Sequence, residues 1–548
     1  MKQLYSRPFF GVILIIGLLA INVPQTVRAA GPWYVASTGD DGNDCLSPAT
    51  PCGTINGAIG KAAGEDTIFV AEGTYTASGT EVVLIDKSIN LVGGWNESFT
   101  TQSGISIIDG SNLRKGIHVN PGIIAIVERF TVQNGSATQG SGVTLVGGGI
   151  YNSGTLTLNN SIVSANTANY GGGISNGGGI STLTGTLTIN DSMIIGNSSG
   201  DGGGIYNTGI LTINNSTVSA NTADSGGGIH NSCCNPFFIQ ILILNNSTIS
   251  NNTANRGGGI INGGTAIVNN STVSNNSATS NGGGIDSDYG GTLILNNSSV
   301  VGNYAGIGGG VTNYSNLAMQ NSILANNIAI VGPECSGTIN SSDHNIIGNT
   351  NGCTVSPGTG NMFNTNPLLG PLENNGGPTF THALLASSPA IDSGNPAGCT
   401  GQDGNLLTTD QRGIARPQGA ACDIGAYEFE PVMIDVSIDI KPGSDNNPIN
   451  PKSKGMIPVA ILSTPDFDAP SMVDTTSLTF GKTGDEASLV SCNEDSEDVN
   501  SDGLFDLVCH FDNQLTLLNI PGLGSGHLSG LTVDGIPIEG HDNVTVLD

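Results

Sequence analysis

The chain has 548 residues, 82 of which are glycine, and a formal net charge of −29 although only 11% of its residues are charged. An acidic surface of this kind repels nucleic acid and anionic lipid, so nucleic acid is excluded as a partner. Lys, Arg and Glu, which favour helices, are scarce, and this excludes a mainly helical fold.

The first 29 residues have the pattern of a signal peptide. Lys2 and Arg7 precede an apolar run from 9 to 21, and residues 27–29 (Val-Arg-Ala) have the small-x-small form of a cleavage site. The apolar run is short for a membrane span, so the mature chain is expected to have none. The sequence therefore predicts a secreted or cell-surface protein; the alternative is an uncleaved anchor.

Ten cysteines support export, because disulfides persist in oxidising compartments. Proximity along the chain is the only basis for pairing eight of them: Cys45 with Cys52, Cys335 with Cys353, Cys399 with Cys422, and Cys492 with Cys509. Cys233 and Cys234 are adjacent, and any free thiols are expected there. The sequence has no Cys-x-x-Cys motif, which disfavours metal binding by the cysteines.

Residues 30–135 are predicted to form an N-terminal cap and the first turns of a coil. Apolar residues recur at helical spacing within 54–63, which indicates a short helix able to cover an open end. Strand-like pieces follow at 68–70, 83–85, 89–92, 107–108 and 130–132. Four stretches here resemble a bacterial secreted pectin-lyase-like family: Tyr34 to Ala36, Asp40 to Cys45, Pro51 to Ile55, and Ala71 to Tyr75.

Residues 136–365 contain one sequence pattern written seven times between Gly147 and Ala329. The copies align on serines at intervals of 31, 24, 31, 24, 27 and 24 residues: Ser161, Ser192, Ser216, Ser247, Ser271, Ser298 and Ser322. An asparagine stands five residues after each serine, apolar residues stand three before and two after it, and each copy has a glycine triplet followed by Ile or Val.

A fixed period above 20 residues is typical of a stacked repeat. The short segments alternate apolar residues with Thr or Ser and end at Asn and Gly, which is the pattern of strands and tight corners. We therefore predict an all-β fold whose main part is a right-handed, single-stranded parallel β-helix. Each turn would pair with the next at about 4.8 Å, and aligned Asn side chains would bond from turn to turn.

The repeats also resemble those of polymorphic outer-membrane proteins of chlamydiae, on Gly226 to Ile229 and Val218 to Asn221. The longer copies place their extra residues at one point, near 175–184, 231–240 and 286–290. Such inserts emerge on one edge of a solenoid and often build its binding face. That edge is predicted to bind a glycan or a partner protein through five residues: Phe237, Phe238, Asp286, Asp288 and Tyr289. The alternative is a loop that folds its Phe residues back onto its own turn.

Residues 366–430 leave the repeat and carry a series of separated motifs. Asn366 to Leu372, Ser388 to Gly394, Thr409 to Gly413 and Cys422 to Glu428 occur in order and resemble the C-terminal part of the choice-of-anchor Q family of bacterial β-helix proteins. We expect a cap that closes the solenoid. Its charged residues are predicted to pair with one another: Asp410, Arg412, Arg416, Asp423 and Glu428.

Residues 431–548 have a different composition, with short strands separated by turns, which predicts a small β-sandwich. Three stretches resemble a domain that recurs at the ends of secreted bacterial proteins: Ile438 to Gly443, Asn450 to Gly455, and Ile457 to Leu462. Oxygen ligands at positions 1, 3, 5 and 9 with glycine at 6 predict a calcium loop formed by Asp498, Asn500, Asp502, the Leu504 carbonyl and Asp506. The alternative is an Asx-rich turn without metal.

The repeats contain few residues that could act as a catalytic base or acid. A lyase needs a base, usually Arg or Lys, and Arg256 is the only one there; the acids are Asp191, Asp201, Asp224, Asp286 and Asp288. If Asp201 and Asp224 stacked on adjacent turns they would offer paired carboxylates, as a glycosidase requires. No catalytic residue is assigned. The prediction is a non-catalytic, adhesin-like scaffold, and the alternative is a polysaccharide lyase or glycoside hydrolase.

Overall fold

The computed structural model describes residues 32–138, 145–177, 185–232, 240–288, 290–339, 341–401, 404–430, 433–493, 495–533 and 535–547. The predicted signal peptide lies outside these residues, as do Cys233, Cys234, Phe237, Phe238 and Tyr289. No helix among the described residues is long and apolar enough to cross a membrane.

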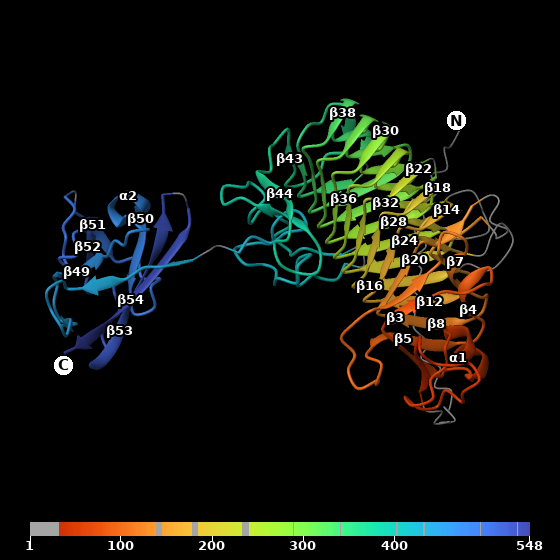
Figure 1. The fold of residues 1–548 in the computed structure, drawn as a ribbon. Coiled ribbons are helices and arrows are strands. Elements are labelled where there is room, and N and C mark those ends of the chain that lie inside the picture. The colour runs from red at the N-terminus through yellow and green to blue at the C-terminus, as the bar shows by residue number, and fades with distance from the viewer. Residues whose placement is uncertain are drawn as a thin grey trace, which may run out of the picture.

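The first part of the chain winds into four parallel sheets that run side by side along one axis (Figure 1). Sheet A consists of β1 (Trp33–Val35), β2 (Thr67–Ala71), β5 (Ile89–Trp95), β8 (Ile124–Glu128), β12 (Thr155–Asn159), β16 (Thr186–Asn190), β20 (Ile210–Asn214), β24 (Ile241–Asn245), β28 (Thr265–Asn269), β32 (Thr292–Asn296), β36 (Asn316–Gln320) and β40 (Ser341–Asp343). Sheet B consists of β3 (Gly73–Tyr75), β6 (Ser106–Asp109), β9 (Phe130–Gln133), β13 (Ile162–Ser164), β17 (Met193–Ile195), β21 (Thr217–Ser219), β25 (Thr248–Ser250), β29 (Thr272–Ser274), β33 (Ser299–Val301), β37 (Ile323–Ala325), β41 (Ile346–Ile347) and β43 (Met362–Phe363).

The other two sheets complete each turn of the coil. Sheet C consists of β4 (Glu81–Ile85), β7 (Lys115–Val119), β11 (Ile150–Asn152), β15 (Ile174–Asn176), β19 (Ile205–Asn207), β23 (Ile229–Asn231), β27 (Ile260–Asn262), β31 (Ile285–Ser287), β35 (Val311–Asn313), β39 (Cys335–Ile339) and β42 (Cys353–Val355). Sheet D consists of β10 (Ser136–Ala137), β14 (Thr167–Tyr170), β18 (Ser198–Asp201), β22 (Thr222–Ser225), β26 (Thr253–Arg256), β30 (Ser277–Asn281), β34 (Tyr304–Ile307) and β38 (Ile328–Val331).

The repeated apolar positions stack in register inside the coil. Leu158 pairs with Ile189 in sheet A, and Val163 pairs with Ile194 in sheet B. All four side chains are fully buried, in one core cluster that runs from the first turns to Val355. Burial of matching apolar side chains on successive turns is what makes a 24-residue period fold as a coil. The predicted parallel β-helix is confirmed.

The repeated asparagines and serines are internal hydrogen-bonding residues. Asn197 Nδ2 donates to Asn221 Oδ1 on the next turn at 3.0 Å and to the Val163 carbonyl at 2.9 Å. The same bond recurs between successive members of the column: Asn166, Asn197, Asn221, Asn252, Asn276, Asn303 and Asn327. The predicted turn-to-turn Asn bonding is therefore confirmed, and we call this column the inner Asn ladder.

Helix α1 (Ile55–Lys61) forms where the sequence predicts it, at the start of the coil. Its N-cap Thr54 accepts a hydrogen bond from the Gly57 backbone N–H, and Ile55, Ala58 and Ile59 are buried in the core of the first turns. In Figure 1 the helix lies at the end of the coil opposite β38. Its apolar side thus covers interior residues that have no preceding turn.

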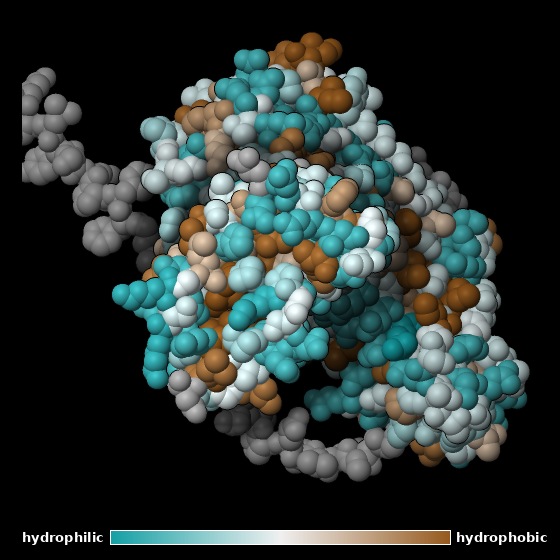
Figure 2. Space-filling view, turned by 90° about the vertical axis from the view of Figure 1, so that its left-hand side faces the viewer, coloured by the Kyte–Doolittle hydropathy of each residue, from teal (hydrophilic) through white to brown (hydrophobic). Residues whose placement is uncertain are grey.

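Sheet D ends at β38 while the other three sheets continue. The exposed side chains of β38 are apolar, and Ile330 is 89% exposed. Hydrophobic atoms gather at the top of the face shown in Figure 2, the height at which Figure 1 places β38. The last strand of sheet D therefore presents an apolar edge.

The segment 366–430 lies along the flank of the coil. It contains β44 (Leu369–Glu373) and β45 (Thr381–Leu384), which pair antiparallel. Thr272 Oγ1 of sheet B donates to Gln411 Oε1 at 2.7 Å, and Ser274 Oγ lies 2.9 Å from His382 Nε2. Its apolar residues form a second cluster with Val301, Ile323, Ala325 and Ile346 on the outside of the coil. The predicted position of this segment, as a cap that closes the solenoid, is therefore wrong, because the segment covers the outer face of sheet B.

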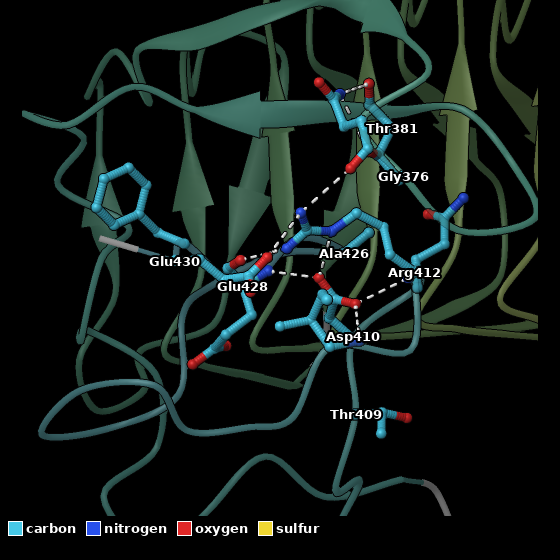
Figure 3. A network of polar contacts seen from close by, with 12 residues as sticks. Gly376, Thr381, Thr409, Asp410, Arg412, Ala426, Glu428 and Glu430 are labelled. Carbon is cyan, nitrogen blue, oxygen red and sulfur yellow. Dashed lines mark hydrogen bonds and ion pairs between the residues drawn. The ribbon is translucent and has the colours of Figure 1, made fainter. Parts of the chain in front are cut away.

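The charged residues of this segment form a buried network, as predicted (Figure 3). Arg412 Nε donates to Asp410 Oδ2 at 2.8 Å, and Arg416 lies 3.5 Å from Glu428. The Glu428 backbone N–H donates to Asp410 Oδ2 at 2.9 Å and so connects the two ion pairs. Because these groups are buried, the pairing offsets the cost of removing their charges from water.

Residues 433–547 form a separate hydrophobic core between two sheets. One sheet consists of β46 (Ile434–Asp435), β48 (Pro448–Ile449), β50 (Val473–Gly481), β53 (Gly522–Thr532) and β54 (Pro537–Val546). The other consists of β47 (Ile438–Ile440), β49 (Met456–Ile461), β51 (Leu489–Cys492) and β52 (Leu507–Asp512), and α2 (Ala469–Met472) precedes β50. Phe480 and Phe511 join the sheets with ring centroids 5.0 Å apart. The predicted β-sandwich is confirmed.

Candidate functional site

The corner between sheet C and sheet A is the place in the chain where the three predicted inserts fall. The residues outside the described ranges at 178–184, 233–239 and 289 each follow a strand of sheet C and precede a strand of sheet A. Of the five residues predicted for a binding surface, Asp286 and Asp288 are described, and both lie at this corner on or just after β31. Phe237, Phe238 and Tyr289 lie outside the described residues, so their part of the prediction is untested.

The outward side chains of sheet C form a column that is rich in aromatic and ionisable groups. They occupy the middle residue of each short strand, which faces outward because the residue before it is buried in the core. The column contains, in register, His118, Tyr151, Ser175, Tyr206, His230, Ile261, Asp286 and Thr312.

The last residues of the sheet D strands reach the same column from the other side of the glycine triplet. Tyr170, Asp201, Ser225 and Arg256 are in register with one another. The chain turns sharply between the two sheets at a glycine in the left-handed region; Gly282 has φ of 61°, and an added Cβ there would lie 2.6 Å from Asp286 Cβ. We call these two columns together, with Lys115, the axial stripe.

The first half of the stripe contains two groups of aromatic contacts. The His118 ring stacks on Tyr151 at 4.9 Å, and the Lys115 ammonium lies 4.5 Å above the centre of the Tyr151 ring. The Tyr170 and Tyr206 rings are 5.3 Å apart. Burial lowers the pKa of Lys115 to about 8, although Glu81 opposes the shift, and burial also lowers the pKa of His118.

The second half of the stripe is ionic. Arg256 Nε donates to Asp286 Oδ2 at 3.0 Å, and its Nη2 donates to Asp288 Oδ1 at 2.8 Å. Asp286 is fully buried, and its Oδ1 accepts no hydrogen bond from the residues that the structure describes. Burial raises the pKa of Asp286 to about 6, although the charge of Arg256 lowers it.

Asp201 and Asp224, which would offer paired carboxylates if they stacked on adjacent turns, do not stack. Asp201 is in register with Ser225, so Asp224 is displaced by one residue and points away as an exposed side chain. Asp201 Oδ1 instead lies 3.5 Å from His230 Nδ1, beside Tyr206. Asp201 and Asp224 therefore form no stacked carboxylate pair, because a one-residue offset along a strand moves a side chain to the other face.

Sequence reasoning missed the aromatic part of the stripe. A signal was present: the residue between Ile and Asn in the motif after each glycine triplet is Tyr151, Ser175, Tyr206, His230 or Ile261. The residue at this position changes chemical class from copy to copy. Variation at a fixed outward position marks a surface that the coil itself does not require.

The loop predicted to bind calcium is held by hydrogen bonds among its own polar groups. Asp498 accepts backbone N–H bonds from Asp502 and Gly503, and Asp502 Oδ2 accepts from Asn500 at 2.9 Å, so these exposed ligands converge. Asp506 is fully buried and accepts from the Ser463 and Val499 backbone N–H groups. Among the described residues no three His, Cys, Asp or Glu side chains form a metal-binding group. Asp506 is thus committed to the fold, and calcium binding by the loop stays a prediction.

Comparisons with known proteins give likenesses of fold. No family model matches the sequence, and no curated protein matches it. A pectate lyase, Pel9A, is 15% identical with a TM-score of 0.44 over 74% of this chain and 98% of its own. XylC in complex with xylose is 12% identical with a TM-score of 0.41, over 73% and 98%. A rhamnogalacturonan lyase is 12% identical with a TM-score of 0.26, over 66% and 96%. Likenesses this distant say nothing of the activity or substrate of this chain.

Proposed function

We propose that the protein is a secreted or cell-surface scaffold that binds a polysaccharide along the axial stripe without cleaving it. The observation that carries the proposal is the aromatic surface of the stripe, where Lys115 and His118 contact Tyr151 and where Tyr206 contacts both Tyr170 and His230. Aromatic faces suit sugar rings, and amide, imidazole and carboxylate groups bond their hydroxyls. The resemblance to the choice-of-anchor Q family remains a prediction that agrees with this role.

The shape of the stripe suits an elongated ligand. Its sheet C column spans eight turns, from His118 to Thr312, and seven steps of about 4.8 Å give roughly 34 Å. The backbone beneath is fixed by paired strands on both sides and by the inner Asn ladder, so little conformational freedom is lost on binding. Four disulfides agree with an oxidising, extracellular compartment.

The electrostatics of Arg256 support a non-catalytic role. Burial alone would lower the pKa of Arg256, but the hydrogen bonds and charges of Asp288 and Asp286 outweigh it and raise the pKa above its ordinary value. A guanidinium held in this way cannot take a proton from a sugar ring. The alternative, a polysaccharide lyase, is favoured by one observation: Lys115, with its pKa near 8, stands at the aromatic end of the stripe.

The test is a binding assay on immobilised plant and bacterial polysaccharides. We expect the Tyr170→Ala/Tyr206→Ala double variant to lose about tenfold or more in affinity, equivalent to 1.4 kcal/mol. Tyr304→Ala is the matched control, because Tyr304 is 53% exposed on sheet D but belongs to the column of Ser277 and Ile328, away from the stripe. Equal affinity of all three proteins would overturn the proposal.

A parallel assay separates binding from cleavage. The same polysaccharides are incubated with the protein, and unsaturated ends and new reducing ends are measured. We expect neither to be released. Release that disappears in Lys115→Ala, with binding retained, would establish the lyase alternative instead.

A further inference from the structure

The axial stripe carries little positive charge. Arg256 is the only Lys or Arg between Arg129 and Arg412 in the sequence. The structure gives it to two carboxylates at once, at 3.0 and 2.8 Å. Its positive charge is therefore paired with two carboxylates of the protein.

The remaining ionisable groups leave the stripe without positive charge to offer. The stripe contains two cations, Lys115 and Arg256, and the carboxylates of Asp201 and Asp286; the Asp288 carboxylate lies beside it and bonds Arg256. Lys115 is buried beneath Tyr151, and Glu81 on the neighbouring strand raises its pKa against the effect of burial. His230 faces Asp201. Burial, together with the charge of neighbouring Lys115, lowers the pKa of His118. The whole chain adds a net charge of −29, which repels anions at long range.

One buried carboxylate oxygen of the stripe lacks a hydrogen-bond donor. Asp286 Oδ1 is buried and has no donor among the described residues, while Oδ2 is satisfied by Arg256. A buried acceptor without a donor carries a desolvation cost that no hydrogen bond offsets. A sugar hydroxyl is a donor of the right kind, whereas a uronate carboxylate is an acceptor only and would face Asp286 with like charge.

We infer that the axial stripe takes a neutral polysaccharide, and that it rejects polyuronates. The inference rests on the proposed function and names the chemical class of its ligand. Rejection follows from like charge and from an acceptor placed against an acceptor. Selection follows from aromatic contact, which is indifferent to charge, together with hydroxyl donation.

The experiment compares each polymer with its own acidic form. Cellulose, mannan and galactan are tested unmodified and after oxidation of C6 to the carboxylate, which changes charge and leaves the backbone. We expect one or more neutral polymers to bind, and its oxidised form to bind at least about tenfold more weakly at low salt. The difference should shrink as salt is raised, because screening weakens repulsion between exposed charges.

Two variants assign the discrimination to the stripe. Asp286→Asn/Asp288→Asn frees Arg256, and the preference for the neutral form over its oxidised form should fall severalfold. Asp224→Asn removes an exposed acid outside the stripe and should leave the preference unchanged. Should the double variant melt at a much lower temperature, Asp288→Asn alone, which alters a half-buried group, is measured instead.

The outcomes separate the two claims. Equal or tighter binding of an oxidised polymer overturns the neutral-ligand inference and leaves the proposed function standing. A preference that survives unchanged in the Asp286 and Asp288 variants also overturns it, since the stripe would not be its source. Binding of no polymer at all overturns the proposed function, and the inference with it.

Discussion

At the scale of single residues, Glu334 ends the inner Asn ladder. Asn327, the last asparagine of the column, donates from its backbone N–H at 3.2 Å and from Nδ2 at 2.6 Å to Glu334 Oε2. The carboxylate thus takes the place that the Oδ1 of the next asparagine would occupy. Glu334 is 3% exposed, and burial raises its pKa to about 7, although the Asn327 bonds oppose the shift.

This raised pKa predicts a pH dependence of stability. Below pH 4.5, the ordinary pKa of the group, Glu334 is protonated in both the folded and the unfolded chain. As the pH rises toward 7 the unfolded chain releases the proton while the folded chain keeps it, so the free energy of unfolding falls and then levels off. We expect Glu334→Gln to gain about 3 kcal/mol relative to the parent between pH 4.5 and pH 8.

Thermal melts across this pH range measure the gain as a widening gap in Tm between the two proteins. Glu373→Gln, at an exposed glutamate of β44, is the control and should keep a constant gap. A constant gap for Glu334→Gln as well would show that the carboxylate has an ordinary pKa.

At the scale of elements, the coil has two kinds of asparagine column that differ in burial. The inner Asn ladder is shielded from water, and Asn221 is fully buried. A second column on the outer face of sheet A also bonds from turn to turn; Asn214 Nδ2 donates to Asn190 Oδ1 at 2.8 Å, but both side chains are half-buried. The same bond is therefore protected in one column and open to replacement by water in the other.

Matched substitutions should separate the two columns. Asn221→Leu removes the bonds that the Asn221 side chain makes with the Asn197 amide, the Ile194 carbonyl and Asn252 Oδ1 in the interior, and we expect it to lower the free energy of unfolding by about 3–5 kcal/mol. Asn214→Leu should cost about 1 kcal/mol or less, because water satisfies the freed groups. Chemical denaturation followed by far-ultraviolet circular dichroism gives both values; similar losses would contradict the distinction.

The loop from Asp498 to Asp506 supports a second prediction at this scale, that calcium binds it weakly, with Kd on the order of 0.1–1 mM. Calcium would then raise the Tm of the C-terminal domain, and Asp502→Ala should abolish the rise while leaving the Tm in chelator unchanged. Asp506→Ala should lower the Tm even in chelator, because Asp506 holds the Ser463 and Val499 backbone N–H groups.

Asp466→Ala, at an exposed aspartate outside the loop, is the control and should keep the full calcium response. Identical melting in calcium and in chelator for the parent protein would mean that the loop is an Asx-rich turn and no more.

At the scale of the whole molecule, four disulfides close the parts of the chain that the repeat does not organise. Cys45 pairs with Cys52 at the first turns and Cys335 with Cys353 at the last. Two further bonds lie within the flank segment and the sandwich, between Cys399 and Cys422 and between Cys492 and Cys509. All four pairs predicted from proximity are confirmed.

These bonds predict the thiol count of protein produced by secretion. The eight paired cysteines should not react with an alkylating reagent in denaturant until a reductant is added. Peptide mapping after alkylation should place any reagent incorporated before reduction at Cys233 or Cys234. Alkylation at Cys45, Cys399 or Cys492 without reductant would contradict the pairing. The reduced protein, alkylated in full, is the control for reagent access.

How much the sequence could predict follows from how local each feature is. The strands of the repeat, the helix after Thr54 and the cysteine pairs depend on neighbours within one turn, and the sequence predicted them. Strand β53 begins at Gly522 with Gly- and Ser-rich residues that have no apolar alternation, so the sequence does not predict where it starts. The position of segment 366–430 was wrong, since an ordered series of motifs says nothing about which outer face will bury them.

The sequence by itself determined that the chain stacks: a repeat whose apolar, Ser and Asn positions recur at fixed offsets has one arrangement that buries all of them together. Only the tertiary structure decided which outward residues meet. Tyr170 and Tyr206, or Arg256 and Asp286, are 30 or more residues apart in the sequence and come from different sheets. They touch because the glycine corner turns one sheet against the next, and the register then sets each residue beside a partner on the following turn. The same reason separates Asp201 from Asp224, which a shift of one residue places on opposite faces.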